Sequence, residues 1–207
     1  MRRHLLLAAA GLAVLVLCGL AASSGTVGSV ERGVFRAVND LPQWLYRPLW
    51  VFQQFGNLFV AVALGVGFAL LLRRAPVAGG VLAAAVLKLG LERTVKQVVE
   101  RARPATTIGH VHLRGNVPVQ GLSFVSGHSV IATAVATLLT PILPGRWKLA
   151  PWVVVVLNGV ARVYVGAHNP LDVIGGAGLG LCIGSALNAV LAAVPARGRA
   201  PVPVLTG

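Results

Sequence analysis

The sequence predicts an all-α, polytopic membrane protein, a bundle of six transmembrane helices. Of its 207 residues, 56% are hydrophobic and only 11% are charged, whereas a soluble domain has about 25% charged residues. The hydrophobic residues form six continuous runs, at roughly 5–22, 57–72, 75–91, 128–143, 149–166 and 173–194. Only helices and closed barrels satisfy their backbone hydrogen bonds in lipid, and the sequence lacks the alternating strands of a barrel. The fold class therefore follows from the composition and from the continuity of these runs.

The first run, residues 5–22, has two interpretations. At 18 residues it is long for a signal peptide, and we expect it to be retained as a membrane helix. The alternative is a cleaved signal peptide, because Arg2 and Arg3 precede the run and small residues follow it. A lipoprotein cleavage site fits poorly, since Leu17 is too large for the position before Cys18.

The other five runs complete a single predicted domain, residues 1–195. Several are shorter than the ~20 residues of a full crossing, so tilt or extension must supply the difference. The run 57–72 has the shortest apolar approach, because the preceding VFQQFGN is only half apolar. Lys88 lies near enough to the end of 75–91 to reach the membrane interface. Residues 196–207 are predicted to be a disordered cytoplasmic tail.

The charged residues predict the orientation in the cytoplasmic (inner) membrane. Basic pairs flank the runs on one side: Arg2 and Arg3, Arg73 and Arg74, Arg146 and Lys148, Arg197 and Arg199. Basic residues in short loops mark the cytoplasmic side, which places both termini there. The five acidic residues fall on the opposite side: Glu31, Asp40, Glu92, Glu100 and Asp172. Topology thus explains the net charge of +13, and we expect no nucleic-acid partner.

A polar triplet, Ser126, Gly127 and His128, opens the fourth run in the stretch FVSGHSVIATAV. One interpretation is structural, because a Ser before an apolar run is often only a helix N-cap. A His in the first turn is unusual, since the positive end of the helix dipole disfavours imidazolium. A helix N-terminus also binds anions, so the triplet is a candidate phosphate site.

A basic stretch, KQVVERARP, lies at residues 96–104 on the extracytoplasmic side. Lys96 and Arg103 are seven residues apart, or two helical turns, so we expect both to point the same way from one helix. Pro104 is expected to stop that helix and to leave Arg103 at its end. The alternative is a solvated helix end or a contact with lipid headgroups.

A third stretch, ARVYVGAHNPLDVIGG, leads into the last run. Asn169 and Pro170 are expected as N-cap and first helical residue, which places Asp172 in the first turn. His168 then lies within reach of Asp172, and a carboxylate bonded to one imidazole nitrogen leaves the other as a nucleophile or base. Arg162 ends the preceding run near the same surface. The alternative is that Asp172 only complements the helix dipole and that His168 is a loop residue.

Together, the three segments bring three cations, two histidines and a helix N-terminus to one face of the membrane, which suits a phosphate. The ordered set K-x6-R-P, S-G-H and R-x5-H-x3-D resembles the signature of the type 2 phosphatidic acid phosphatase (PAP2) family, and in particular its six-helix bacterial members. The resemblance covers most of the chain. Two positions depart from the family pattern, because Val125 stands where Pro is common and Ala161 where Ser is common. Neither supplies a charged or nucleophilic group, so we expect altered loop geometry or one lost hydrogen bond.

The resemblance implies a function and a role for each site residue. It implies a lipid phosphate phosphatase that needs no metal or other cofactor and acts at the extracytoplasmic face on a polyprenyl diphosphate, phosphatidylglycerol phosphate or phosphatidic acid. His168 would form a phosphohistidine, Asp172 would orient it, and His128 would protonate the leaving group. The residues expected to hold the phosphate are Lys96, Arg103, Ser126, Gly127 and Arg162. Phosphoryl transfer depends mainly on positioning and charge stabilisation, which agrees with this set.

Other functions are compatible with parts of the pattern. A lipid phosphotransferase would pass the phosphoryl group to an acceptor hydroxyl instead of water. Vanadium haloperoxidases share the motifs but are soluble, so the membrane runs argue against one. A non-catalytic lipid-binding or transporter-like membrane protein would need the cations but not the two histidines. The sequence does not predict which lipid is the substrate, nor the oligomeric state.

Two other groups of residues are weaker candidates for a site. His110 and His112, in GHVHLRG, could ligate zinc, but no second pair of ligands accompanies them, and we expect a flexible lid or rim instead. Cys18 and Cys182 lie inside apolar runs, where we expect small buried hydrophobic residues rather than a disulfide or a metal site.

Overall fold

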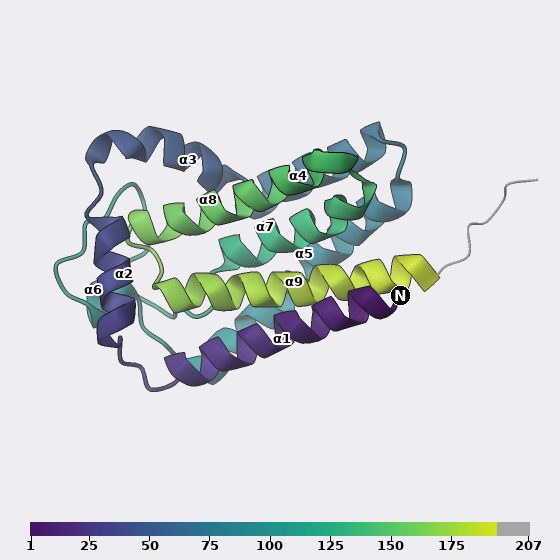
Figure 1. Ribbon diagram of the computed structural model, residues 1–207. Coiled ribbons are helices and arrows are strands. Elements are labelled where there is room, and N and C mark those ends of the chain that lie inside the picture. Colours follow the sequence, from purple (N-terminus) through teal and green to yellow (C-terminus); the bar gives the residue numbers. More distant parts are fainter. Residues whose placement is uncertain (194–207) are drawn as a thin grey trace, which may run out of the picture.

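The structure, a computed structural model, describes residues 1–193 and consists of long helices packed side by side (Figure 1). The helices are α1 (Arg2–Ala22), α2 (Ser29–Asn39), α3 (Tyr46–Gln54), α4 (Leu58–Leu71), α5 (Ala75–Val99), α6 (Pro104–Thr107), α7 (Gly127–Leu139), α8 (Ala150–Tyr164) and α9 (Pro170–Ala193). No strand occurs within the described residues, so the predicted all-α architecture is confirmed, and each apolar run corresponds to one helix. The predicted tail, 196–207, and the domain end at 195 lie outside the described residues.

The long helices make this a multi-pass membrane protein. By length and hydropathy, α1, α5 and α9 can each cross a bilayer. The segments Gln43–Gln54 and Leu58–Leu71 qualify only as a pair that bends by 59°. Gly127–Ile142 is apolar but shorter. The count of six spans therefore stays a prediction.

Helices α2 and α3 lie outside the predicted runs. In Figure 1, α2 crosses the end of the bundle where α8 ends and α9 begins. Phe35 and Asn39 of α2 are buried, whereas Arg32 and Arg36 are exposed, which is the four-residue spacing of an amphipathic helix. A search for long apolar runs misses such a helix, because only one of its faces is apolar.

Small residues let α9 pack closely against its neighbours. A Cβ placed on Gly11 of α1 would lie 2.6 Å from the carbonyl oxygen of Gly178, and one on Gly178 would lie 2.8 Å from that of Gly11. On the α7 side, a Cβ on Gly184 would lie 2.7 Å from the Cβ of Thr137. Close backbone approach between small residues is the usual basis of helix association in lipid, where apolar burial gives no driving force.

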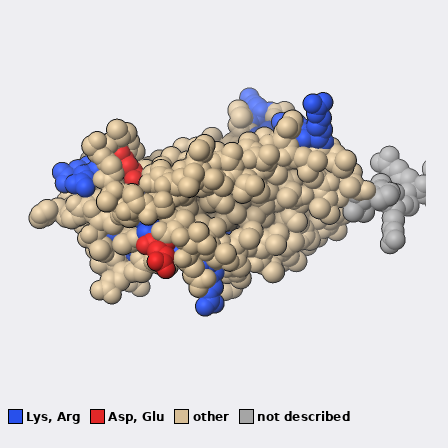
Figure 2. All heavy atoms as spheres, turned by 90° about the horizontal axis from the view of Figure 1, so that it is seen from below, with Lys and Arg blue, Asp and Glu red and all other residues tan. Residues whose placement is uncertain are grey.

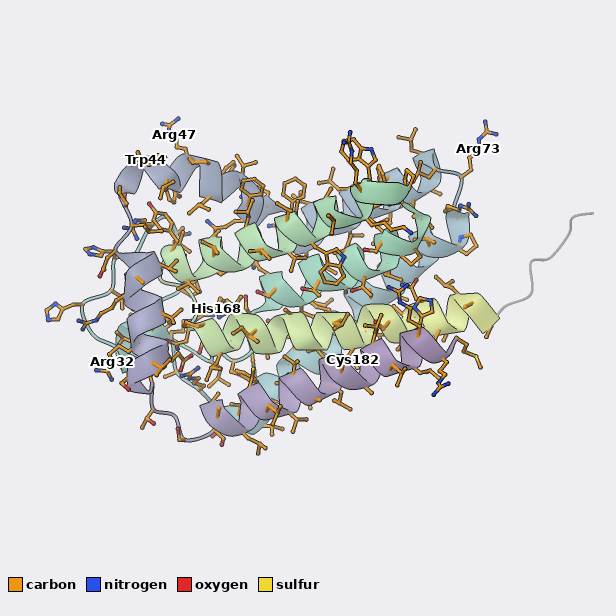
Figure 3. The ribbon with its side chains drawn as sticks, in the orientation of Figure 1. Arg32, Trp44, Arg47, Arg73, His168 and Cys182 are labelled. Atoms are coloured by element: carbon orange, nitrogen blue, oxygen red, sulfur yellow. The ribbon has the colours of Figure 1, made fainter. Side chains whose placement is uncertain are left out.

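The charged side chains mark the two ends of the bundle. In Figure 2, the visible acidic side chains lie in the left half, whereas the charged side chains visible in the right half are all basic. The left end is the one covered by α2 in Figure 1, and the right end carries Arg73 (Figure 3). This distribution agrees with the predicted segregation of acidic residues to one side.

The contact between α1 and α9 should be sensitive to a single methyl group. We expect Gly11→Ala to lower the free energy of unfolding by about 1–3 kcal/mol, because the added Cβ overlaps the α9 backbone. The control is Gly79→Ala in α5, where a Cβ meets nothing within 4 Å. Thermal unfolding of both variants in detergent measures the difference. Equal stability of the two variants would contradict the close contact described here.

Candidate active site

The three motif segments meet at the end of the bundle that α2 covers. Hydrogen bonds to backbone carbonyls join them directly, so the arrangement does not depend on side-chain packing alone. These bonds run from Ser123 N to Arg101 O at 2.7 Å, from Ser126 N to Asp172 O at 2.9 Å, and from Arg103 Nη1 to Ala167 O at 2.9 Å.

The first segment is not one continuous helix, and the expectation that Lys96 and Arg103 share a helix face is wrong. α5 ends at Val99, and Glu100 follows it in the left-handed conformation, with φ +49°. Pro104 begins the short helix α6 instead of ending α5, which is the position that proline favours. Arg103 therefore precedes a new helix and reaches back to the loop that holds His168.

Lys96 is an ion-paired residue in this structure. Its ammonium lies 2.6 Å from Glu92 Oε1, and Lys88 lies 2.6 Å from the other oxygen of the same carboxylate. The Glu92 carboxylate lies against Gly127, so closely that a Cβ on Gly127 would overlap it. Glu92 thus brings Lys96 to the N-terminus of α7, although no motif in the sequence marks this carboxylate as part of a site.

The second segment confirms a helix start at the polar triplet. Ser126 occupies the N-cap position of α7, but its hydroxyl makes no capping hydrogen bond. That buried Oγ has no partner among the described residues. The Ser126 hydroxyl therefore does not act as a helix cap. His128 lies in the first turn of α7 and is half-buried.

Arg162 lies in the last turn of α8 and is 7% exposed. Its Nη1 donates a 2.7 Å hydrogen bond to Gln53 Oε1 of α3, whereas its Nε has no partner among the described residues. Asn158, one turn earlier in α8, donates to the Phe52 carbonyl at 3.0 Å. The residues of α3 that orient Arg162 carry no motif, so the sequence offered no signal for them.

The third segment begins α9 as predicted, with Pro170 as its first residue and Asp172 in the first turn. His168 is 3% exposed and Asp172 is fully buried. The expected hydrogen bond between them is absent, because His168 Nδ1 lies 3.7 Å from Asp172 Oδ2, beyond bonding distance. Asp172 Oδ2 instead accepts from the backbone N–H of Asn169 at 2.8 Å. Nδ1 still faces the carboxylate.

The other oxygen of Asp172 contacts Arg101, which was not among the site residues predicted from the sequence. Arg101 is fully buried, and its Nη1 donates to Asp172 Oδ1 at 3.2 Å and to Glu31 Oε1 at 2.9 Å. Burial disfavours the charged guanidinium, but the two carboxylates outweigh that effect and raise the pKa of Arg101. The signal was present in ERARP, where Arg101 precedes Arg103 by two residues.

Burial and the neighbouring charges favour a neutral imidazole at His168. Burial is the main cause and lowers the pKa of His168 to about 4; Arg162 and Arg103 lower it further, and Asp172 opposes them. Burial also lowers the pKa of Arg103, against the charges of Asp172 and Glu92. A neutral imidazole with Nδ1 toward a carboxylate keeps Nε2 available as a nucleophile.

The loop with His110 and His112 is anchored at its centre. The buried Arg114 donates 2.7 Å bonds to the carbonyls of Asn39 and Tyr164 and lies 4.1 Å from the centre of the Tyr164 ring. His112 N donates to Asn39 Oδ1 at 2.9 Å. Within residues 1–193, no group of three His, Cys, Asp or Glu side chains is arranged to hold a metal ion.

The two cysteines are free thiols. Cys18 is buried as expected, whereas Cys182 is only half-buried, at the middle of α9 (Figure 3). Neither lies in the segments that form the candidate site.

An apolar groove of about 810 Å³ runs along the bundle between α4, α7 and α8. On α7 it is lined by Ala132, Val135, Ala136 and Leu139, and Ala132 is one helical turn from His128. Phe55 also lines the groove, and the adjacent Gly56 lies against His128. The groove therefore begins beside the candidate site and extends toward the opposite end of the bundle.

Comparisons with known proteins agree on one family. A model of the PAP2 superfamily matches residues 75–195, more than half of the chain. Phosphatidylglycerophosphatase B of Bacillus subtilis is 33% identical over 103 residues, which cover 45% of this chain and 47% of that protein. Undecaprenyl-diphosphatase of Sulfolobus acidocaldarius is 35% identical over 92 residues, 44% of each chain. The chain spans about half the length of the curated relatives it matches.

Two solved structures have the same arrangement of helices. LpxE of Aquifex aeolicus superposes with a TM-score of 0.69 at 26% identity, over 76% of this chain and 93% of that one. A transmembrane PAP2 type phosphatidylglycerolphosphate phosphatase from Bacillus subtilis gives a TM-score of 0.72 at 21% identity, over 91% and 99% of the two chains. The second likeness shows the fold alone.

Burial of His168 should lower the pH at which its imidazole titrates. In side-chain ¹⁵N NMR of the protein in detergent, we expect His168 to titrate near pH 4, well below the ordinary value of about 6.5. Because its folded pKa is lowered, the unfolded chain binds this proton more readily, and stability should fall as the pH drops from about 6.5 toward 4. His168→Gln identifies the resonance. Titration of His168 near pH 6.5 would contradict its burial.

Proposed function

The chain belongs to the PAP2 superfamily, and we propose that it hydrolyses a phosphomonoester or diphosphate of a membrane lipid through a phosphohistidine. The observation that carries the proposal is the meeting of His168 and His128 with Arg103 and Arg162 at the N-terminus of α7. Such a cluster of cations and helix N–H groups suits a phosphate, and two histidines with different surroundings suit a nucleophile and a proton donor. The related proteins named above are lipid phosphatases, which supports the same activity here.

In the proposed reaction, Nε2 of neutral His168 attacks phosphorus while the bond from phosphorus to the leaving oxygen breaks. His128 donates a proton to that oxygen, and Asp172 stabilises the charge that develops on His168. Water then attacks the phosphohistidine, with His128 accepting its proton, and inorganic phosphate leaves. Arg103 and Arg162 hold the equatorial oxygens, together with Lys96 and the N–H groups of the Ser126–Gly127 turn.

Lys96 takes part in this binding while it is paired with Glu92. An ammonium group has three donors, so Lys96 can keep its bond to Glu92 and still donate to a phosphate oxygen. The two guanidinium groups have no carboxylate of their own in contact among the described residues, and they are the stronger candidates for phosphate contacts.

The apolar groove supports a lipid as the carrier of the phosphate. It is lined almost entirely by apolar side chains, and it begins beside His128, where the leaving group would lie. A hydrocarbon chain in this groove would run along α7 for about 16 Å, at 1.5 Å per residue from His128 to Leu139. The phosphate would then lie at the membrane interface while the tail stays in the hydrocarbon region.

We place the site on the extracytoplasmic face of the cytoplasmic membrane, with both termini in the cytoplasm. The basic pairs at the opposite end of the bundle, which include Arg73 and Arg74, support this orientation through the positive-inside rule. The exposed Trp44 and the adjacent Arg47 point away from the bundle near the site (Figure 3), as residues of a membrane interface do.

Phosphate release in detergent tests the proposed activity. With EDTA present, we expect inorganic phosphate to be released from lipid monophosphates or diphosphates, and vanadate to inhibit, since it can adopt the five-coordinate geometry of the transition state. His168→Ala should abolish release on every substrate. Loss of activity in chelator that a divalent metal restores would overturn the metal-free mechanism.

The two histidines should differ in their dependence on the leaving group. We expect His128→Ala to lose about 10²–10⁴-fold in rate on a lipid monophosphate, because an alkoxide needs the proton. The same variant should retain far more activity on p-nitrophenyl phosphate, since nitrophenolate leaves without one. His168→Ala should be inactive on both substrates. Activity in His168→Ala with complete loss in His128→Ala would mean that the two roles are reversed.

Cysteine labelling in intact cells tests the orientation. In a background without Cys18 and Cys182, we expect Thr106→Cys, which is exposed on α6, to react with an impermeant thiol reagent. Ala75→Cys, exposed at the start of α5, should react only after the membrane is permeabilised. The reverse pattern would place the site in the cytoplasm.

A further inference from the structure

Arg101 and Glu31 form a buried ion pair behind the catalytic carboxylate. Arg101 is fully buried, and both of its terminal nitrogens bond to Glu31, at 2.9 Å and 2.5 Å. Glu31 lies in the first turn of α2, and its Oε1 also accepts the backbone N–H of Leu171 at 3.0 Å. The pair therefore connects α2 and the segment after α5 to the first turn of α9.

Both terminal nitrogens of Arg101 are occupied by acceptors from the protein itself. Its Nη1 is shared between Glu31 and Asp172, and its Nη2 donates to Glu31 and to the Thr26 carbonyl at 3.4 Å. These acceptors direct the guanidinium toward α2 and the base of α9. Arg103, two residues later, is the arginine that reaches the His168 loop.

Both oxygens of Asp172 are occupied by donors other than His168. Oδ1 accepts from Arg101, and Oδ2 accepts from the N–H of Asn169, which leaves 3.7 Å between Oδ2 and His168 Nδ1. The carboxylate is thus held in one orientation, with part of its charge shared with a buried cation.

We propose that Arg101 and Glu31 are positioning residues for His168, which act by fixing the orientation and the charge of Asp172. The inference rests on the proposed phosphatase function. Glu31 holds the guanidinium in place, Arg101 holds Oδ1, and Oδ2 is thereby aimed at Nδ1 of His168. When phosphorus bonds to Nε2, the developing positive charge draws Nδ1–H to Oδ2, and the carboxylate meets it without rotating.

Three variants and a matched control test this arrangement. Arg101→Met removes the cation, Arg101→Lys keeps the charge but loses the two-pronged contact, and Glu31→Gln removes the anchor with little change of shape. The control is Arg114→Met, because Arg114 is also a buried arginine with several backbone acceptors but does not contact Asp172. For each variant we would measure thermal unfolding, kcat and KM, the rate of phosphoenzyme formation, and the His168 titration by ¹⁵N NMR.

We expect Arg101→Met to lower kcat and phosphoenzyme formation by about 10²-fold with KM changed less than about threefold, since misplacement of a reacting group costs rate rather than binding. Arg101→Lys should recover part of that loss. Arg101→Met should raise the pKa of His168, because the full charge of Asp172 becomes available to it. Glu31→Gln should lower that pKa, because Arg101 then pairs with Asp172 alone. Arg114→Met should lose stability without shifting the titration of His168.

The opposite shifts of the His168 pKa in Arg101→Met and Glu31→Gln distinguish a positioning role from a role in folding stability alone. A role in folding alone would move the His168 pKa in both variants toward its exposed value, and that result would overturn the proposal. An increase in KM with normal kcat in Arg101→Met would also overturn it, because Arg101 would then be a phosphate ligand. If Arg101→Met does not fold, Arg101→Lys and Glu31→Gln decide the question. The His168 titration needs no substrate, so it tests the positioning independently of activity. If the two variants shift the His168 pKa in opposite directions but the protein releases no phosphate from any lipid, the positioning is upheld and the phosphatase function is rejected.

Discussion

The buried guanidinium of Arg101 is the contact on which the organisation of the site depends. A charge without water is tolerated only when opposite charges and hydrogen bonds surround it, and Glu31, Asp172 and the Thr26 carbonyl provide them here. Removal of one partner from a buried ion pair typically costs about 3–5 kcal/mol, since the other charge is left without compensation. The segments that carry these partners, α2, the segment after α5, and α9, are therefore constrained to meet at one point.

The second constraint is the close backbone contact between α7 and α9. Ser126 N–H bonds to the Asp172 carbonyl, and a Cβ on Gly176 would lie 2.7 Å from the Ser126 carbonyl oxygen. A larger residue at position 176 would push the N-terminus of α7 away from the first turn of α9. The helix N–H groups that suit a phosphate and the loop of His168 are thus adjacent because glycine permits it.

The sequence pattern predicted those helices whose formation depends on residues close together in the chain. Continuous apolar runs predicted the long helices, and Asn169–Pro170 predicted the start of α9, because hydrophobicity and proline geometry act over a few residues. The prediction failed where a turn intervened. Lys96 and Arg103 were expected on one helix, but the left-handed residue Glu100 ends α5 between them. An amphipathic helix such as α2 carries a weaker signal than a membrane run, and it supplies Glu31.

The sequence by itself determined the fold class, the polar residues of the three motif segments, and the resemblance that gives His168, His128 and Asp172 their expected roles. Only the tertiary structure decided their contacts: the bond of Asp172 to Arg101, the 3.7 Å gap to His168, the pairing of Lys96 with Glu92, and the groove beside His128. The reason is physical. Helix periodicity and membrane partition are set by neighbours in the chain, whereas the charge state and orientation of a buried side chain are set by groups 70 or 71 residues away, as Glu31 and Asp172 are from Arg101.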